Sequence, residues 1–256
     1  MLIAVTRAVS PAFAQCELTF IKRQPIDLAK ANKQHHAYQK LLGKLGARVV
    51  SLPAEPELPD SMFVEDPALV LDELAVIFPL GTETRRREAS TIAAALAPFR
   101  SLKFVQLPGT LEGGDILRLD RKLFVGLTAR SNSEGISQLA RIVAPHGYQV
   151  VGVPVTGCLH LKSAVTSLGK NTLLANRSWF DSSFFPAFDW IDVDPAEAYA
   201  ANALAFAGTI LFPASFERTR ARIEARGFHL TPLDISELQK AESGLTCSSL
   251  IFAAAS

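Results

Sequence analysis

The chain has 256 residues, of which 48% are hydrophobic and 20% are charged, and its formal net charge is +1. This balance is typical of a globular protein and excludes a disordered one. The sequence has no run of 18 apolar residues and no block of like charges, so we expect neither a membrane-spanning helix nor a nucleic-acid or membrane-surface partner.

The three cysteines, Cys16, Cys158 and Cys247, show neither CxxC nor zinc-site spacing. We therefore predict reduced thiols, as in a cytoplasmic protein. The N-terminal apolar run is too short for a secretory signal, and no basic region precedes it. No linker-like stretch divides the chain, and we expect one domain over residues 1–256.

Strand and helix patterns alternate along the chain. A strand is predicted at 2–6, a helix with one apolar stripe at 28–45 and a strand at 48–52; Gly46 suits the helix end. Four further units, each of two strands, a helix and a strand, are predicted at 68–71, 74–78, 84–97 and 103–107; at 116–119, 123–125, 132–144 and 148–153; at 164–168, 172–175, 179–185 and 190–193; and at 203–206, 209–212, 216–225 and 228–233.

This alternation indicates the α/β class. A last strand at 249–252 is expected to lie beside 2–6, which completes the first unit. Five similar ββαβ units in one chain indicate a closed ring, a five-bladed αβ-propeller sealed by the N- and C-terminal strands.

Three polar residues stand in unusual places. Cys247 lies in a Gly/Ser/Thr turn before an apolar strand, where a thiol can be an exposed nucleophile. His160 stands between leucines at the expected start of a strand and is the natural proton carrier. Glu112 precedes a Gly pair, where the backbone can approach a ligand closely. Of the other histidines, His35 and His36 are assigned to a polar helix face.

A fourth feature is the acidic cluster in residues 60–66, which suits a planar cation through charge-assisted hydrogen bonds. Each of these features alone also fits an ordinary structural role. A lone cysteine can be a small buried hydrophobe, a histidine can be a satisfied core residue, and an acidic cluster can be a solvated loop.

Together and in this order, the features resemble the dimethylarginine dimethylaminohydrolase (dimethylargininase) family of the guanidine-modifying, or pentein, superfamily. The resemblance covers essentially the whole chain. It rests on separated motifs: the loop at 17–19, then FVEDP, GTETRRRE, LEGGDI, TARSNSEG, LHLK, AEAYAAN, FERTR and GLTCSSL. It also implies the five-bladed propeller.

The resemblance implies that Cys247 is the nucleophile and that His160 is the general acid and base. It also implies that Glu112 orients His160 and stabilises its positive charge. It implies the following substrate-binding residues: Asp66, Glu65 and Asp60 at the guanidinium, Phe63 at the pocket wall, Arg85 and Arg130 at the carboxylate end, Leu18 on a lid loop, and the backbone carbonyl near Ala241 at the α-amine.

The implied reaction converts an Nω-methylated arginine into citrulline and a methylamine through a covalent thiouronium on Cys247. The expected partner is a small-molecule substrate, no cofactor or metal is needed, and the sequence leaves a homodimer open. Arginine deiminases are similar but carry a second carboxylate two residues after the catalytic histidine, where this chain has Lys162. A dimethylated nitrogen has no N–H for that carboxylate to accept.

The chain also departs from the family pattern. Glu17 stands in the lid where a small residue is expected, and residues 240–244 keep little beyond Gly244. Other N-substituted guanidines, or arginine itself, therefore stay open as substrates. A non-catalytic pentein binding protein, a zinc protein and a papain-like hydrolase fit less well. The three catalytic residues are all present, two ligands do not complete a zinc site, and the cysteine stands near the C-terminus.

Overall fold

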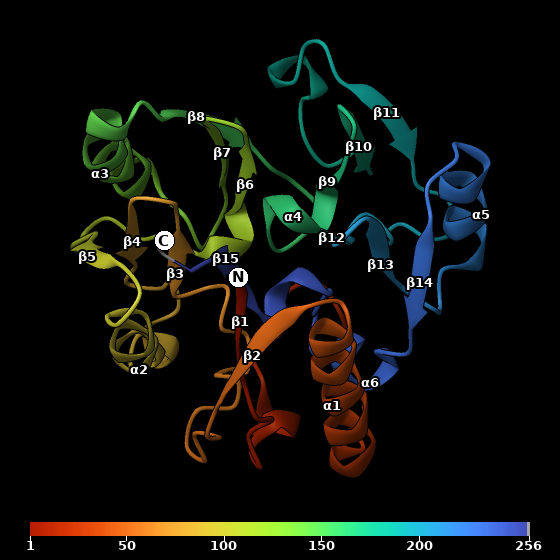
Figure 1. Cartoon of the computed structure of the whole chain (residues 1–256), viewed down its shortest axis with the longest axis horizontal. Helices are drawn as coiled ribbons and strands as arrows, with labels where there is room; N and C mark the ends of the chain where they lie inside the picture. Colours follow the sequence, from red (N-terminus) through yellow and green to blue (C-terminus); the bar gives the residue numbers. More distant parts are fainter. Residues whose placement is uncertain (255–256) are drawn as a thin grey trace.

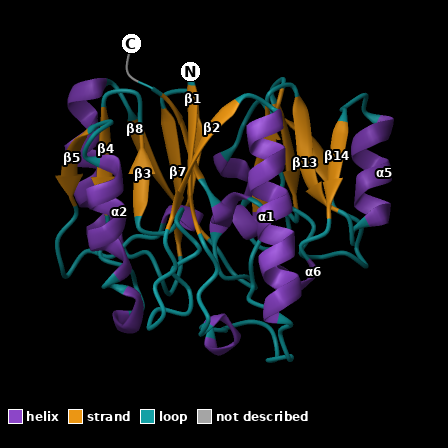
Figure 2. Cartoon of the chain, turned by 60° about the horizontal axis from the view of Figure 1, so that its bottom comes forward, coloured by secondary structure: helices purple, strands orange, loops and turns teal. Residues whose placement is uncertain are grey.

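The computed structural model describes residues 1–254 and closes the chain into a ring of five similar units (Figure 1). Each unit has one three-stranded sheet, and the longer helices lie on the outside of the ring. In the side view of Figure 2, the strands run along the ring axis and the loops gather at the end opposite the N-terminus.

The sheets have these strands: β15 (Leu250–Ala253), β1 (Leu2–Arg7) and β2 (Ala47–Leu52); β3 (Ala68–Val70), β4 (Leu74–Ile77) and β5 (Ser101–Phe104); β6 (Ile116–Leu119), β7 (Lys122–Leu127) and β8 (Gln149–Pro154); β9 (Val165–Gly169), β10 (Thr172–Ala175) and β11 (Asp189–Asp192); β12 (Leu204–Phe206), β13 (Thr209–Pro213) and β14 (Leu230–Leu233). In every sheet the middle strand pairs antiparallel with the first strand and parallel with the third.

The helices are α1 (Leu28–Lys44), α2 (Glu88–Leu96), α3 (Ser133–Val143), α4 (Leu161–Ala164), α5 (Glu217–Ala225) and α6 (Ser236–Gln239), with the 3-10 turns η1 (Phe13–Gln15), η2 (Glu83–Arg85), η3 (Gly113–Asp115), η4 (Ala144–His146), η5 (Ser182–Phe184) and η6 (Thr246–Ser248). Within residues 1–254, no helix is long and apolar enough to cross a membrane.

The predicted propeller and its closure are confirmed. Strand β1 pairs antiparallel with β15, from Leu2 opposite Ala253 to Val5 opposite Leu250. The two ends of the chain therefore share one sheet, which closes the ring.

Local sequence signals explain where the helices begin and end. The side chain of Asp27 accepts a hydrogen bond from the Lys30 N–H at the start of α1, and Gly46 has a φ of 96° just after its end. The side chain of Asn132 accepts from the Gly135 N–H at the start of α3. These caps lie within one residue of the predicted helix boundaries.

Four expected elements differ. The helix predicted at 84–97 is split into η2 and α2, and the strand predicted at 103–107 is β5, two to three residues earlier. In the fourth sheet's unit, the weak helical pattern at 179–185 forms only η5, which Pro186 follows closely. The last strand lies one residue later than predicted.

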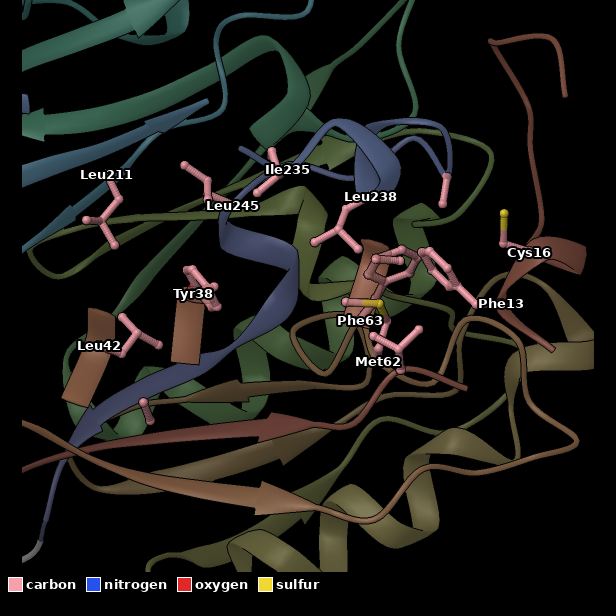
Figure 3. Packing of buried hydrophobic residues seen from close by; sticks show 14 of the residues in the cluster. Phe13, Cys16, Tyr38, Leu42, Met62, Phe63, Leu211, Ile235, Leu238 and Leu245 are labelled. Atoms are coloured by element: carbon pink, nitrogen blue, oxygen red, sulfur yellow. The ribbon is translucent and has the colours of Figure 1, made fainter. Parts of the chain in front are cut away.

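One apolar cluster packs α1 against the loops at the end of the ring opposite the N-terminus. Figure 3 shows Tyr38 and Leu42 on α1 together with Phe13, Met62 and Phe63 from the loops that follow β1 and β2. The rings of Phe13 and Phe63 meet edge to face at 5.8 Å between centroids. This packing fixes the acidic loop 60–66 at the end of the ring where the candidate catalytic residues lie.

Candidate active site

The three residues expected to be catalytic meet at the end of the ring where the loops gather. Glu112 lies just before η3, His160 just before α4, and Cys247 within η6. These segments lead into β6, β9 and β15, which begin three different sheets. The ring therefore brings together residues that are far apart in the sequence. His160 precedes a short helix and not a strand, which corrects the prediction for that position.

A narrow cavity of about 20 Å³ lies between these segments. Its size is close to that of one water molecule, so the site is closed as it stands. Its lining includes most of the predicted site residues: Asp60, Phe63, Asp66, Arg85, Arg130, His160, Ala241 and Cys247. Glu17, Leu159, Glu242 and Ser243 complete the lining.

Glu112 and His160 form a buried ion pair. Nε2 of His160 lies 2.7 Å from Oε2 of Glu112, and Glu112 is fully buried. The other carboxylate oxygen of Glu112 accepts from the Gly81 N–H at 3.2 Å, and the backbone N–H of Glu112 donates to the Ser131 hydroxyl at 3.0 Å. These bonds fix the carboxylate, which in turn fixes the plane of the imidazole.

The two glycines after Glu112 are needed for close packing. A Cβ on Gly113 would lie 2.0 Å from the carbonyl oxygen of Glu65, and one on Gly114 would lie 2.5 Å from Nδ1 of His160. The sequence had indicated close approach to a ligand at this Gly pair. The structure shows close approach to the imidazole and to the acidic loop instead.

Asp115 is a site residue to which sequence reasoning assigned no role. It is fully buried and accepts hydrogen bonds from the hydroxyls of Thr128 and Ser131 and from the Leu161 N–H. Burial raises its pKa to about 6. The Leu161 bond holds the start of α4, which places His160. Its position in the LEGGDI motif was the available signal.

The charge of His160 is set by its neighbours. Burial alone would lower its pKa, but the carboxylates of Asp115, Glu112 and Asp66 outweigh burial and raise the pKa to about 9. Glu112 shows the converse: burial opposes its ionisation, yet the His160 hydrogen bond and the nearby Arg85 and Arg130 lower its pKa. Near neutral pH the pair is an imidazolium and a carboxylate.

Cys247 stands in the turn η6 with its side chain half-buried. Its sulfur accepts from the Gly244 N–H at 3.5 Å. Burial, together with the negative charges of Glu65 and Asp66, raises the thiol pKa to about 12. The thiol is therefore protonated until a positive charge arrives beside it.

Asp66 offers a free acceptor at the cavity. It is 3% exposed, and its Oδ2 accepts from Nη1 of Arg85 at 3.0 Å. Its Oδ1 is buried and has no hydrogen-bond partner among the described residues. An orphaned buried carboxylate oxygen is costly in a folded protein, and a donor from a bound molecule would satisfy it.

The two arginines at the cavity differ in how firmly they are held. Arg85 is buried and donates to both oxygens of Glu88 at 3.0 Å, in addition to Asp66. The Arg130 guanidinium makes longer contacts within residues 1–254, at 3.5 Å to Glu112 and 3.3 Å to the Thr19 hydroxyl. Both were expected at the substrate carboxylate, and Arg130 is the freer of the two.

The structure does not place the Glu65 side chain in the cavity, contrary to the sequence prediction. Its carboxylate contacts the Lys162 ammonium and accepts from the Thr246 hydroxyl at 2.9 Å. Its backbone N–H donates to the Cys247 carbonyl at 3.3 Å. Glu65 thus lies behind the nucleophile, facing a separate central cavity of about 440 Å³.

The remaining predicted residues take different positions. Asp60, Phe63 and the Ala241 segment line the cavity, whereas Leu18 packs against the apolar cluster around α1 and does not line it. Glu17 lines the cavity in its place. The Glu17 N–H donates to Asp60 at 3.1 Å, so the acid expected near the guanidinium also holds the lid.

Asp66, Glu112 and His160 each present a potential ligand atom within 4.8 Å of the others. A metal ion there would displace the Glu112–His160 bond and would meet the guanidinium groups of Arg85 and Arg130 at the same carboxylates. We therefore assign no metal to this cluster.

Comparison with known proteins gives consistent matches. Residues 13–181 match the family model described as "N,N dimethylarginine dimethylhydrolase, eukaryotic". The chain is 36% identical over 228 residues to the N(G),N(G)-dimethylarginine dimethylaminohydrolase of Pseudomonas aeruginosa, covering 88% of this chain and 90% of that protein. It is 35% identical over 249 residues to the protein of that name from Streptomyces coelicolor, covering 96% and 95%.

Solved structures agree with the sequence matches. A mutant of DDAH from Pseudomonas aeruginosa complexed with citrulline superposes with a TM-score of 0.92 at 32% identity, covering 97% of this chain and 98% of that one. A dimethylarginine dimethylaminohydrolase adduct with S-methyl-L-thiocitrulline gives 0.93, also at 32% identity, covering 98% and 100%. The N-terminal domain of the cyanobacterial arginine dihydrolase ArgZ, at 18% identity and a TM-score of 0.83, shares the fold.

Proposed function

This chain belongs to the dimethylarginine dimethylaminohydrolase family, and from that premise we propose how its own residues carry out the reaction. The chain is a hydrolase that converts Nω-methylated arginine into citrulline and a methylamine through a covalent cysteine intermediate. We assign Cys247 as the nucleophile, His160 as the general acid and base, and Glu112 as the residue that orients His160.

The observation that carries this assignment is the unpaired Oδ1 of Asp66, buried beside the Glu112–His160 pair and the Cys247 thiol. A guanidinium group is planar and cationic, and it donates N–H bonds in its plane. Asp66 can accept one of these bonds and so hold the plane with its central carbon facing Cys247. Binding also ends the unfavourable isolation of Oδ1.

The charge of the substrate then explains how a thiol with a raised pKa becomes reactive. A guanidinium beside Asp66 offsets the negative charges that hold the Cys247 pKa near 12. We expect the thiol proton to be released as the cation binds, because the thiolate and the guanidinium stabilise each other. The substrate thus activates its own nucleophile.

The chemistry then takes two steps. The Cys247 thiolate forms an S–C bond with the guanidinium carbon, the bond to the methylated nitrogen breaks, and His160 gives its proton to the departing amine. In the second step His160 takes one proton from water, the oxygen bonds to the carbon, and the C–S bond breaks to release citrulline, with the remaining proton going to the Cys247 sulfur to restore the thiol. A pKa of about 9 supplies the protonated imidazole that the first step needs.

The surroundings of Lys162 support methylated arginine over arginine. Its ammonium contacts Glu65 and so neutralises that acid behind Cys247. Because Lys162 and Thr246 engage the Glu65 carboxylate, it is not free to accept from the four terminal N–H bonds of unmodified arginine. Arginine remains the alternative substrate, because the arginine dihydrolase fold is similar.

Four further proposals accompany the reaction. We propose that residues 1–256 form one catalytic domain, of which the last two residues lie outside the described part. The three unpaired cysteines support a cytoplasmic location. A homodimer stays a prediction that light scattering tests. The proposed partner is the small-molecule substrate, with the carboxylate end near Arg130 and the α-amine at the Ala241 carbonyl.

The deciding experiment measures citrulline and dimethylamine released from asymmetric dimethylarginine, with arginine as the competing substrate. We expect turnover of dimethylarginine by the wild type and none by Cys247→Ala. Cys16→Ala is the matched control, because that thiol is buried and its pKa is raised to about 11. Faster citrulline formation from arginine would replace the proposal with a deiminase, and equal loss in both cysteine variants would remove Cys247 as the nucleophile.

A further inference from the structure

Residues 17–26 cross the active-site end of the ring as a strap without regular structure. The strap follows η1 and precedes α1, and no backbone–backbone hydrogen bond to any of its residues occurs in the described chain. Its N-terminal end is held by Phe13 and Cys16, which are fully buried in the apolar cluster (Figure 3). The Arg23 side chain donates to the Ala14 and Cys16 carbonyls at 2.7 Å and 2.5 Å and so ties the strap to its own N-terminal end. The backbone amides of residues 19–21 are instead held by a side chain from elsewhere.

One carboxylate accounts for most of that hold. Oε2 of Glu242 accepts from the Thr19 N–H at 2.6 Å, and Oε1 accepts from the Phe20 and Ile21 N–H groups at 2.5 Å and 3.0 Å. Three successive amides around one anion form a concave binding site for negative charge. Bonds to an ionised acceptor are also stronger than neutral ones.

Glu242 is placed for this contact by an unusual backbone. Its φ is 54°, in the left-handed region that residues other than glycine rarely adopt. It lies five residues before Cys247, in the segment that runs from α6 to η6. Backbone strain of this kind persists only where the surrounding structure determines it, and here the side chain ends on the strap.

The same segment also holds the far end of the strap. The Glu237 carboxylate accepts from the Asp27 N–H at 2.9 Å, and the Lys240 ammonium donates to the Pro25 carbonyl at 3.0 Å. These contacts lie next to the start of α1, which stays fixed. When the Glu242 bonds are made, residues 19–21 lie on the cavity, and when these bonds break, residues 19–21 are free to move away from it.

The cavity under the strap requires such an opening. It holds about 20 Å³, whereas an arginine derivative is many times larger. Glu17 and Glu242 both line it, and Arg130 reaches across it to the Thr19 hydroxyl. Three of the roughly four acceptor sites of the Glu242 carboxylate are taken by strap amides, so in this closed arrangement most of its hydrogen-bonding capacity serves the strap.

We propose that Glu242 is a latch: its carboxylate closes the strap 17–26 over the catalytic cavity, and the three bonds break and re-form in each turnover. The kinetic part of this inference rests on the proposed function. Glu242 is a positioning residue, since it acts through the strap. Loss of the carboxylate raises KM about tenfold or more by removing the closed state, while kcat changes less.

The test is hydrogen exchange of the Thr19, Phe20 and Ile21 amides, followed by mass spectrometry without any substrate. Glu242→Gly removes the carboxylate and also suits a φ of 54°, so it preserves the backbone. Glu242→Gln keeps the shape and one acceptor oxygen. Glu217→Gln makes the same chemical change on an exposed helix residue and is the control.

We expect exchange of the three amides to be about 10- to 100-fold faster in Glu242→Gly, intermediate in Glu242→Gln and unchanged in Glu217→Gln. Unchanged exchange in Glu242→Gly would overturn the latch, even if KM rose, because Glu242 would then act on the substrate directly. Exchange does not depend on which guanidine is hydrolysed. If exchange is faster in Glu242→Gly than in the wild type, but the wild type does not turn over dimethylarginine, the proposed function is refuted and the latch stands.

Discussion

Two buried histidines in this molecule have opposite surroundings. His160 is 5% exposed at the active site, and His35 is 3% exposed on α1. His160 has the carboxylates of Glu112 and Asp115 nearby, and its pKa is raised to about 9. Neither ring nitrogen of His35 has a hydrogen-bond partner among residues 1–254.

The surroundings of His35 show what burial does by itself. Burial lowers its pKa to about 4, and the nearby Arg7 backbone offsets only part of that effect. The ring lies 6.3 Å from that of Tyr38. The comparison teaches that depth alone makes a histidine neutral, whereas depth combined with fixed carboxylates makes it an acid that is charged at neutral pH.

The largest expected difference between the two histidines is in catalysis. We predict that His160→Asn lowers kcat/KM for dimethylarginine by about 10³-fold, because both proton transfers depend on that imidazole. His35→Leu should leave kcat/KM within about twofold, since an apolar side chain replaces a ring whose nitrogens are unpaired. Steady-state kinetics of both variants decides. Comparable losses would mean that His35 has a part in the site.

A second change makes His160 more like His35. Glu112→Gln removes the carboxylate that contacts Nε2, so the pKa of His160 should fall from about 9. We expect kcat to fall about 100-fold. The alkaline decline of kcat/KM, which reports loss of the His160 proton, should begin at lower pH than in the wild type. A pH profile from 6 to 10 tests this, and an unshifted decline would show that Glu112 does not set the charge.

The sequence predicted the ring because each unit carries its own strand and helix patterns. Their boundaries were mostly within two residues, and caps such as Asp27 and Asn132 explain that accuracy. It also predicted that Glu112 and His160 belong together, from a family resemblance that covers the whole chain. The unit with only η5 was weak because Pro186 and short aromatic runs leave no long amphipathic pattern.

The failures of the sequence analysis come from tertiary contacts. His35 was assigned to a polar face, yet it lies four residues after Ala31 and three before Tyr38, on the buried stripe of α1. Glu65 was expected at the substrate because its neighbour Asp66 is there. The two residues lie in a turn, however, and the Lys162 ammonium and the Thr246 hydroxyl decide where the Glu65 carboxylate points. No local signal showed that Glu242 would meet the strap.

The smallest predicted effect is on acid stability, and it isolates the burial of His35. The unfolded chain binds a proton at His35 below about pH 6.5, whereas the folded chain binds it only below about pH 4. Stability is therefore fully present above pH 6.5 and is lost as the pH falls towards 4. His35→Leu removes this loss. The free energy of unfolding of the variant minus that of the wild type should therefore be about 1.4 kcal/mol more favourable to the variant at pH 5.5 than at pH 7.5.

Urea unfolding of wild type and His35→Leu at both pH values measures this difference. His160 has the opposite slope: its raised pKa stabilises the folded protein below about pH 6.5, and that contribution is lost as the pH rises towards 9. The difference in free energy of unfolding between wild type and His160→Asn should accordingly become smaller as the pH rises from about 6.5 to 9. Parallel curves for His35→Leu and wild type between pH 7.5 and 5.5 would mean that the folded protein admits a proton to His35. Burial would then not lower the pKa of His35, and the two histidines would differ only in the groups that contact them.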